Sequence, residues 1–245
     1  MSRGRAAYSV GVVCEAAKDQ RVATALAERV LCHEVDWIDP ETVGNFCRWR
    51  GLDDDHNHLP WTAVEAQARR RRLRAHGRFQ ERKGVFDEHR ARLAKRLFML
   101  LDEPPAAILL VRDTDNQAGR PENLKSFRDR GSANPQIVLA LPHTKLECWI
   151  LAGYEPADAD EEARLGTERK HLGFDPRTQA HRLTTQGTKG KRNAKKVLER
   201  LASTEREEAC WLETPIETLR ERGSNTGLTD YLEEVRERLV PIVAG

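Results

Sequence analysis

Two aspartates, Asp113 and Asp115, stand one residue apart, shortly after the apolar run at residues 106–111. Side chains alternate along an extended strand, so residues two positions apart point the same way. If the apolar run is a strand, the two carboxylates lie side by side where the chain leaves the core. Such neighbouring negative charges favour the binding of a cation.

A third carboxylate, Glu15, directly follows another apolar run at residues 8–14. Ligands of open parallel sheets bind beyond the carboxyl ends of the strands. Glu15 together with Asp113 and Asp115 would form an all-oxygen site that suits Mg²⁺ or Mn²⁺. Because Mg²⁺ is usually held by one or two carboxylates and a substrate phosphate, the site implies a phosphate ester as substrate. The alternative is that these acids only make the strand ends soluble.

The elements that would position these acids alternate between strands and helices. Strands are predicted at residues 8–14, 33–38, 106–111 and 136–141, helices at residues 18–31, 62–101 and 143–153, and a short helix or loop at residues 121–130. Nearly continuous apolar strands separated by helices are typical of an α/β fold with a mostly parallel, Rossmann-like sheet covered on both faces.

The same pattern predicts an α/β domain at residues 1–157 with a helical insertion at about 41–103, and a helical C-terminal region at 158–245 packed on it. The charged fraction of 33% is typical of a globular chain, and no apolar run reaches the roughly 18 residues needed to span a bilayer, so we expect no membrane partner. The five scattered cysteines lack a CxxC pair, which indicates reduced thiols and a cytoplasmic location.

Three segments resemble motifs of the topoisomerase–primase (TOPRIM) domain. Residues 13–19 (VCEAAKD) are similar to its first motif, in which a glutamate ends strand one and leads into a helix. Residues 113–120 (DTDNQAGR) are similar to its second motif, Asp-x-Asp followed by a turn of small residues. Residues 146–152 (LECWILA) resemble the Glu-Ala-Trp helix of small stand-alone TOPRIM-like proteins related to the overcoming-lysogenization-defect (OLD) nucleases. The resemblance covers about residues 8–40 and 104–153.

This resemblance implies an Mg²⁺-dependent or Mn²⁺-dependent nuclease that hydrolyses phosphodiester bonds of DNA or RNA. Proteins of that group are commonly paired with a separate AAA-type or ABC-type ATPase and are associated with defence against phage. By matching position, Asp113 and Asp115 would be metal ligands, and Glu15 would be a ligand or the general base. Asp19, one helical turn beyond Glu15, would hold a second ion directly or through water. Glu147 would complete the site or be a structural carboxylate.

Two residues depart from the family pattern. Ala16 stands where the family usually has glycine, and Gly119 lies one residue farther from the acid pair than in primases. Both departures loosen the match around the metal, but no carboxylate is lost.

Two basic clusters are candidates for contact with nucleic acid. A surplus of arginine and lysine can neutralise phosphates, and binding through it weakens as salt rises. The predicted contact residues are Arg70, Arg71, Arg74 and Arg78 in the first cluster and Lys189 and Lys191 in the second. The alternatives are a solvated helical face or a surface for an acidic partner protein. The second cluster contains no Walker A motif, so any ATP hydrolysis would come from another chain.

Two other classes of function stay open. The first is a non-catalytic subunit that uses the same fold and basic helices to bind nucleic acid or an ATPase. The second is a phosphatase or nucleotidyl-transfer enzyme, because Asp-x-Asp after a strand also begins other phosphoryl-transfer sites. Against the second, no threonine or glycine follows the acids in the pattern that such phosphatases need, and Glu15 would have no role.

Overall fold

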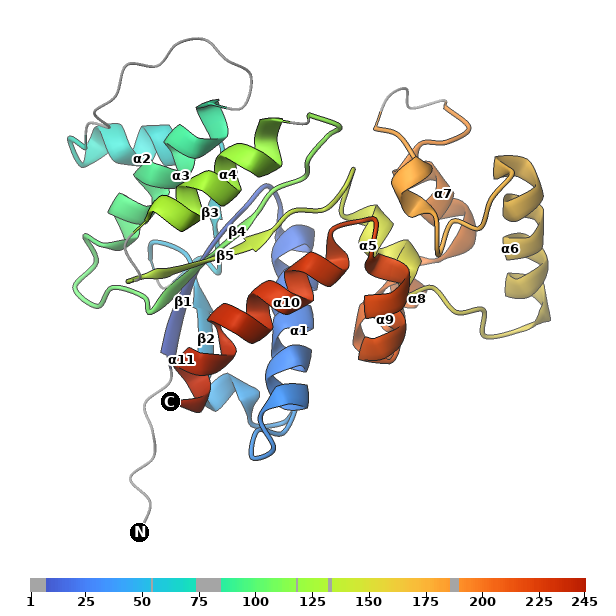
Figure 1. The fold of residues 1–245 in the computed structure, drawn as a ribbon, viewed down its shortest axis with the longest axis horizontal. Coiled ribbons are helices and arrows are strands. Elements are labelled where there is room, and N and C mark those ends of the chain that lie inside the picture. Colours follow the sequence, from blue (N-terminus) through green and yellow to red (C-terminus); the bar gives the residue numbers. More distant parts are fainter. Residues whose placement is uncertain (1–7, 54, 74–84, 118, 132–133, 186–189) are drawn as a thin grey trace. The chain divides into compact units, whose positions relative to one another are not determined.

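A computed structural model of residues 1–245 describes the whole chain except residues 1–7, 54, 74–84, 118, 132–133 and 186–189 (Figure 1). The chain forms two compact units that are interleaved in sequence. The first unit comprises Met1–Arg112, Gln117–Ala140 and Glu233–Gly245, and the second comprises Asp113–Asn116 and Leu141–Leu232. No helix among the described residues is long and apolar enough to cross a membrane.

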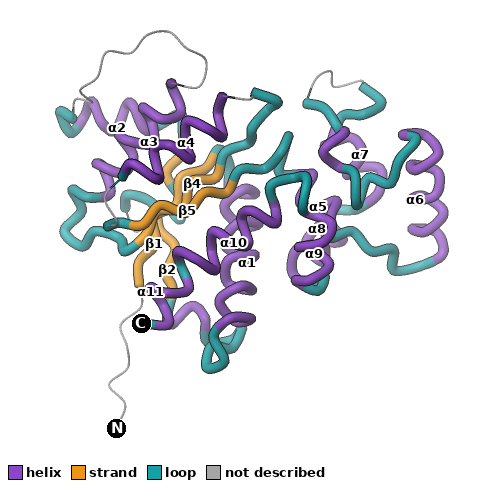
Figure 2. Tube along the Cα trace, in the orientation of Figure 1, coloured by secondary structure: helices purple, strands orange, loops and turns teal. Residues whose placement is uncertain are grey.

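The first unit is built on a parallel sheet. Its strands are β1 (Tyr8–Cys14), β2 (Cys47–Arg50), β3 (Leu59–Pro60), β4 (Ala107–Val111) and β5 (Gln136–Ala140). They lie in the order β2-β1-β4-β5, with β3 also paired to β1, and every pairing is parallel. All residues of β4 are buried, as expected for a central strand covered on both faces. The predicted α/β fold class is confirmed (Figure 2).

The predicted strand at residues 33–38 is wrong. The first helix, α1 (Ala17–Glu34), ends within this segment, and the backbone N–H of its C-cap residue Val35 donates to the carbonyl of Leu31 at 3.0 Å. Val35 and Ile38 are buried from a turn. A short apolar pattern does not distinguish a strand from a helix end followed by a turn, and this segment forms the helix end and the turn.

The strand that takes its place in the sheet is β2, which lies within the predicted helical insertion. It is an edge strand that pairs with β1, and Arg48 on it is exposed. Trp49 Nε1 donates to Glu28 Oε1 of α1 at 2.7 Å, so a side-chain hydrogen bond ties the strand to the helix. Because an edge strand needs only one buried face, its sequence carries no continuous apolar run.

Helices cover both faces of the sheet. On one face lie α1 and the C-terminal α11 (Val240–Ala244), and on the other lie α3 (Val85–Phe98) and α4 (Gly119–Arg130), with α2 (Val64–Arg70) beside α3 (Figure 1). The Phe98 ring packs so closely on β1 that a Cβ added to Gly11 would lie 2.7 Å from it. The predicted insertion therefore contains α2 and α3, together with β2, β3 and the short helix η1 (Val43–Asn45).

The second unit is helical in the part that the structure describes. Its helices are α5 (Glu147–Ala152), α6 (Ala159–Leu172), η2 (Ala180–Arg182), α7 (Ala194–Leu201), α8 (Thr204–Leu212), α9 (Ile216–Gly223) and the first residues of α10 (Leu228–Arg238). The buried helix α5 packs against α7, α8 and α9. Its Trp149 stacks on Tyr231 with ring centroids 5.1 Å apart and donates to the carbonyl of Thr226 at 2.7 Å.

Candidate active site

The loop that carries the aspartate pair belongs to the second unit. Beyond β4, the backbone N–H of Thr114 donates to the carbonyl of Pro142 at 2.9 Å, and that of Asp115 to the carbonyl of Thr144 at 3.1 Å. Asp115 and Asn116 then adopt left-handed backbone conformations with φ of 49° and 58°. Asp and Asn are the non-glycine residues that tolerate this region best, so their side chains suit the sharp turn.

The carboxylates of Asp113 and Asp115 lie side by side and share one cation, the ammonium of Lys145. The Lys145 Nζ atom is 3.0 Å from Asp113 Oδ2 and 2.7 Å from Asp115 Oδ1. The other oxygen of Asp113, Oδ1, accepts a hydrogen bond from the backbone N–H of Leu146 at 3.0 Å. The pair therefore has the geometry of a two-carboxylate cation site.

The electrostatics of Lys145 follow from these contacts. Burial alone would lower the pKa of Lys145, but its hydrogen bonds to Asp115 and Asp113 and their negative charges raise the pKa above its ordinary value. Lys145 is therefore a fixed positive charge at neutral pH. The sequence analysis missed it, although its place shortly after the fourth predicted strand, beside the end of the third, was a usable signal.

A histidine lies on the same loop as Lys145. The Nδ1 atom of His143 is 3.1 Å from the Oγ1 atom of the buried Thr114. Burial, and to a smaller extent the neighbouring His181, lowers the pKa of His143 below its ordinary value of 6.5, which favours the neutral imidazole at pH 7. A neutral imidazole can accept or donate a proton.

Glu15 follows β1 in the first unit and is exposed, with 42% of its side chain accessible. Its carboxylate forms an ion pair with Arg112, which follows β4. The Nε atom of Arg112 lies 3.2 Å from Asp87 Oδ1, and Arg120 Nε lies 2.7 Å from Asp87 Oδ2. Asp87 and Arg120 are 4% and 5% exposed. Charges of alternating sign thus run from α4 through α3 to the end of β1.

The aromatic ring of Trp61 helps to fix Arg112. The guanidinium carbon of Arg112 lies 5.7 Å from the ring centroid, and the indole N–H donates to the carbonyl of Val111 at 2.7 Å. The sequence analysis missed Arg112, Asp87 and Arg120, because their partners come from elements far apart in the chain.

Asp19 has a local role in the helix that begins after Glu15. Its Oδ2 atom accepts a hydrogen bond from the backbone N–H of Ala16 at 3.0 Å, and its negative charge lies in the first turn of α1. Both features stabilise the start of the helix. Ala16 itself has an extended backbone with φ of −141°, which any residue adopts, so glycine is not required there.

Glu147 is the first residue of α5, in the second unit with Asp113 and Asp115, and is half-buried. Glu15 and Asp19 belong to the first unit. Among the described residues, no group of three or more histidine, cysteine, aspartate or glutamate side chains is arranged to hold a metal ion. The hard oxygen donors of Asp113 and Asp115, already gathered around one cation, fit Mg²⁺ or Mn²⁺.

The first predicted nucleic-acid cluster lies partly outside the described residues. Arg70 and Arg71 are exposed at the end of α2, and Arg74 and Arg78 fall in the segment that the structure does not describe. Arg72 has a left-handed backbone with φ of 54°, just after α2 has ended. The exposed surface at Arg70 and Arg71 is thus available for contact with phosphates.

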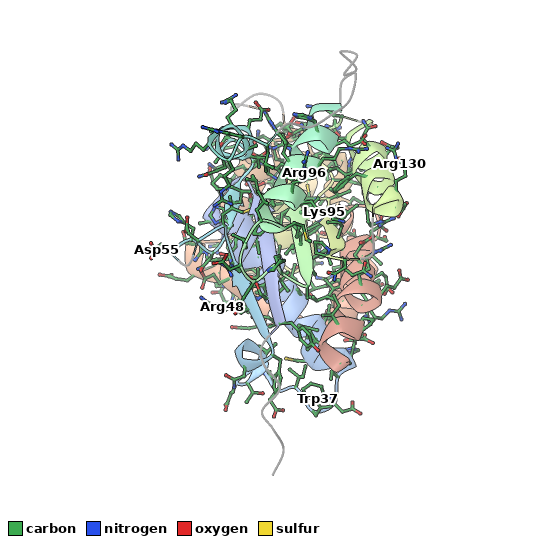
Figure 3. The ribbon with its side chains drawn as sticks, turned by 90° about the vertical axis from the view of Figure 1, so that its left-hand side faces the viewer. Trp37, Arg48, Asp55, Lys95, Arg96 and Arg130 are labelled. Carbon is green, nitrogen blue, oxygen red and sulfur yellow. The ribbon has the colours of Figure 1, made fainter. Side chains whose placement is uncertain are left out.

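Part of the positive charge on α3 is neutralised within the first unit. Arg90 Nε lies 2.9 Å from Glu65 Oε1, and Arg92 Nη2 lies 2.5 Å from Glu88 Oε1. Farther along the helix, Lys95 and Arg96 lie on the side of the unit where Arg130 ends α4 (Figure 3). Burial lowers the pKa of Lys95.

The second predicted cluster lies before α7. Lys191 is exposed, and Lys189 falls outside the described residues. Asn193 caps the helix by accepting a hydrogen bond from the backbone N–H of Lys196 at 3.1 Å.

No family model, curated protein or solved structure matches the chain. The likeness to TOPRIM domains therefore stays a prediction from the motifs.

Proposed function

We propose that this protein is an Mg²⁺-dependent or Mn²⁺-dependent nuclease of the TOPRIM type that hydrolyses phosphodiester bonds of DNA or RNA. The observation that carries the proposal is the convergence of Asp113 and Asp115 on one cation position at the end of a buried strand. The motif resemblance extends it to an effector of antiphage defence that acts with a separate ATPase in the cytoplasm.

In this proposal Asp113 and Asp115 would hold the metal, which would supply Lewis acidity and lower the pKa of a bound water. The backbone N–H of Leu146 orients Asp113 by donating to one of its oxygens. Lys145, whose charge is fixed, neutralises negative charge that develops on the phosphate. The neutral imidazole of His143 can move a proton at Nδ1 or Nε2. Glu15 keeps its predicted role as a ligand or general base.

The test is a cleavage assay with labelled DNA and RNA oligonucleotides in Mg²⁺, Mn²⁺ or EDTA. We expect shortened products only with metal, and a loss of at least about 100-fold in Asp113→Asn. Glu15→Gln forms a separate arm that tests the role of Glu15. Asp36→Asn, which removes a carboxylate from an exposed turn, is the matched control and should cleave normally. Normal cleavage by Asp113→Asn would overturn the assignment.

A non-catalytic subunit that binds nucleic acid or an ATPase is the second candidate. One observation favours it: Glu15, Asp113 and Asp115 are each already paired with a protein cation, Arg112 or Lys145. Such a subunit would shift labelled nucleic acid on a gel and never shorten it, with or without metal. The same assay therefore separates the two candidates.

A further inference from the structure

Two arginines of the second unit lie against one aromatic ring. The ring belongs to Phe174, which follows α6 and is 6% exposed. The guanidinium carbon of Arg182 lies 4.4 Å from the ring centroid, and that of Arg192 lies 5.6 Å from it. Both arginines are exposed, so the buried ring supports two cations that face solvent.

Hydrogen bonds hold the two arginine-bearing segments together. The backbone N–H of Thr184 donates to the carbonyl of Arg192 at 2.8 Å, and that of Ala194 donates to the carbonyl of Thr184 at 3.2 Å. Arg182 Nη1 also donates to Gln179 Oε1 at 2.7 Å. The two guanidinium groups are thus preorganised before any ligand arrives, which reduces the entropy that binding costs.

Lys191, the neighbour of Arg192, is exposed and fixed through its backbone. Its carbonyl accepts a hydrogen bond from Arg200 Nη2 at 3.3 Å. Arg200 in turn pairs with Glu168 of α6 at 2.6 Å. A third cation therefore lies next in sequence to one of the two supported arginines.

The acid next to Phe174 in sequence is already bound to other arginines. Asp175, next to Phe174, contacts Arg169 at 2.7 Å and Arg177 at 3.1 Å. Among the described residues, no carboxylate forms an ion pair with the side chain of Arg182, Lys191 or Arg192. The surface therefore carries positive charge that the described part of the protein does not neutralise.

We propose that Arg182, Arg192 and Lys191, supported by Phe174, bind the phosphate backbone of nucleic acid, an inference that rests on the proposed nuclease function. A guanidinium binds two phosphate oxygens at once through its planar fork. Because Phe174 is buried beneath the arginines, the ring orients them and does not stack on bases. Contacts of this kind are independent of sequence and sensitive to salt.

The test uses Asp113→Asn protein, which keeps the nucleic acid intact, and labelled DNA and RNA of one length in fluorescence anisotropy. We expect Arg182→Ala and Arg192→Ala each to weaken binding roughly 5- to 10-fold at 0.1 M salt and to reduce the salt slope by about one. The control Arg236→Ala removes one exposed cation from α10 in the first unit. It should change neither the binding affinity nor the salt slope. Unchanged binding in both arginine variants would overturn the proposal.

The ring is tested by Phe174→Leu and Phe174→Tyr. The leucine variant should weaken binding several-fold, and the tyrosine variant should restore it, because only tyrosine keeps an aromatic face beneath the cations. Melting temperatures identify any loss of folding. If a folded Phe174→Leu variant binds normally, the supporting role of the ring is wrong.

Two further comparisons complete the test. Polyglutamate that displaces DNA as effectively as unlabelled DNA would show a surface for acidic protein and overturn the proposal. Binding that depends on Arg182 and Arg192 without cleavage by the wild-type protein would contradict the nuclease function alone. Cleavage that is insensitive to both substitutions, with unchanged binding, would contradict this inference alone.

Discussion

The ammonium of Lys145 occupies the position between the two aspartates that a metal ion would take. Two carboxylates around one ammonium leave one negative charge in a half-buried position, which a divalent cation would neutralise better than a monovalent one. The lysine is therefore both the internal counter-ion of the pair and a competitor of any metal. If the proposed metal displaced it, the ammonium could contact a phosphate of the proposed substrate.

Replacing Lys145 by glutamine should strengthen metal binding. Removal of the competing charge is expected to tighten Mn²⁺ binding at least roughly tenfold, about 1.4 kcal/mol. Isothermal titration calorimetry at pH 7.5 measures the change, and Lys145→Arg, which keeps the charge, should bind Mn²⁺ as the wild type does. Lys170→Gln, an exposed lysine of α6, controls for net charge. Equal affinities of Lys145→Gln and the wild type would contradict the competition.

At the scale of elements, hydrogen-bonded charges fix the ends of helices. Asp175 lies beyond α6 and bonds to Arg169 within that helix and to the side chain and backbone N–H of Arg177 in the following turn. Burial by itself would raise the pKa of Asp175, but these hydrogen bonds prevail and lower the pKa below its ordinary value of 3.8. The turn that precedes Arg182 is thereby tied to α6.

The contribution of Asp175 to stability should depend on pH. A lowered pKa means that the unfolded chain binds the proton more tightly, so the stabilisation is present above pH 3.8 and is lost as pH falls through the lowered pKa. Asp175→Asn should reduce the free energy of unfolding by about 2 kcal/mol at pH 7. In urea unfolding, the difference from the wild type should shrink below pH 3.8. Asp160→Asn is the exposed control, and a difference that does not vary with pH would contradict the linkage.

At the scale of the whole molecule, the chain leaves the first unit after Arg112 and again after Ala140, and it returns at Gln117 and at Glu233. The sheet unit therefore includes the C-terminal residues, and α11 packs against α1 there. Val243 is 1% exposed, which shows that this last helix is part of the core of the first unit.

The helix α11 lies about 230 residues from β1 in sequence. A charge placed in its buried face should nevertheless destabilise the sheet unit. Val243→Asp should lower the free energy of unfolding by about 3 kcal/mol or more, because it buries an unpaired carboxylate. Ala244→Asp, on an exposed neighbour, should change it by less than about 0.5 kcal/mol. Urea unfolding measures both, and hydrogen exchange should show faster exchange in β1 of Val243→Asp. Equal stabilities of the two variants would disprove the packing role.

The sequence by itself determined the strands β1, β4 and β5, because residues buried on both faces of a parallel sheet must be apolar throughout. It also predicted that Asp113 and Asp115 lie side by side, and the structure gathers both around Lys145, although Asp115 stands in a left-handed turn and not on an extended strand. It did not reveal β2, whose edge position permits a polar sequence, and it misassigned residues 33–38, where α1 ends and a turn follows.

Only the tertiary structure decided which charges meet. Lys145 reaches the aspartate pair because the chain after β5 hydrogen-bonds to the loop after β4. Arg112, just beyond β4, reaches Asp87 because α3 covers that face of the sheet (Figure 1). These pairings join residues about 30 and 25 positions apart, so periodicity in the local sequence does not predict them. The order of strands in the sheet and the packing of the helices select each partner, and both result from burial of apolar surface summed over the whole chain.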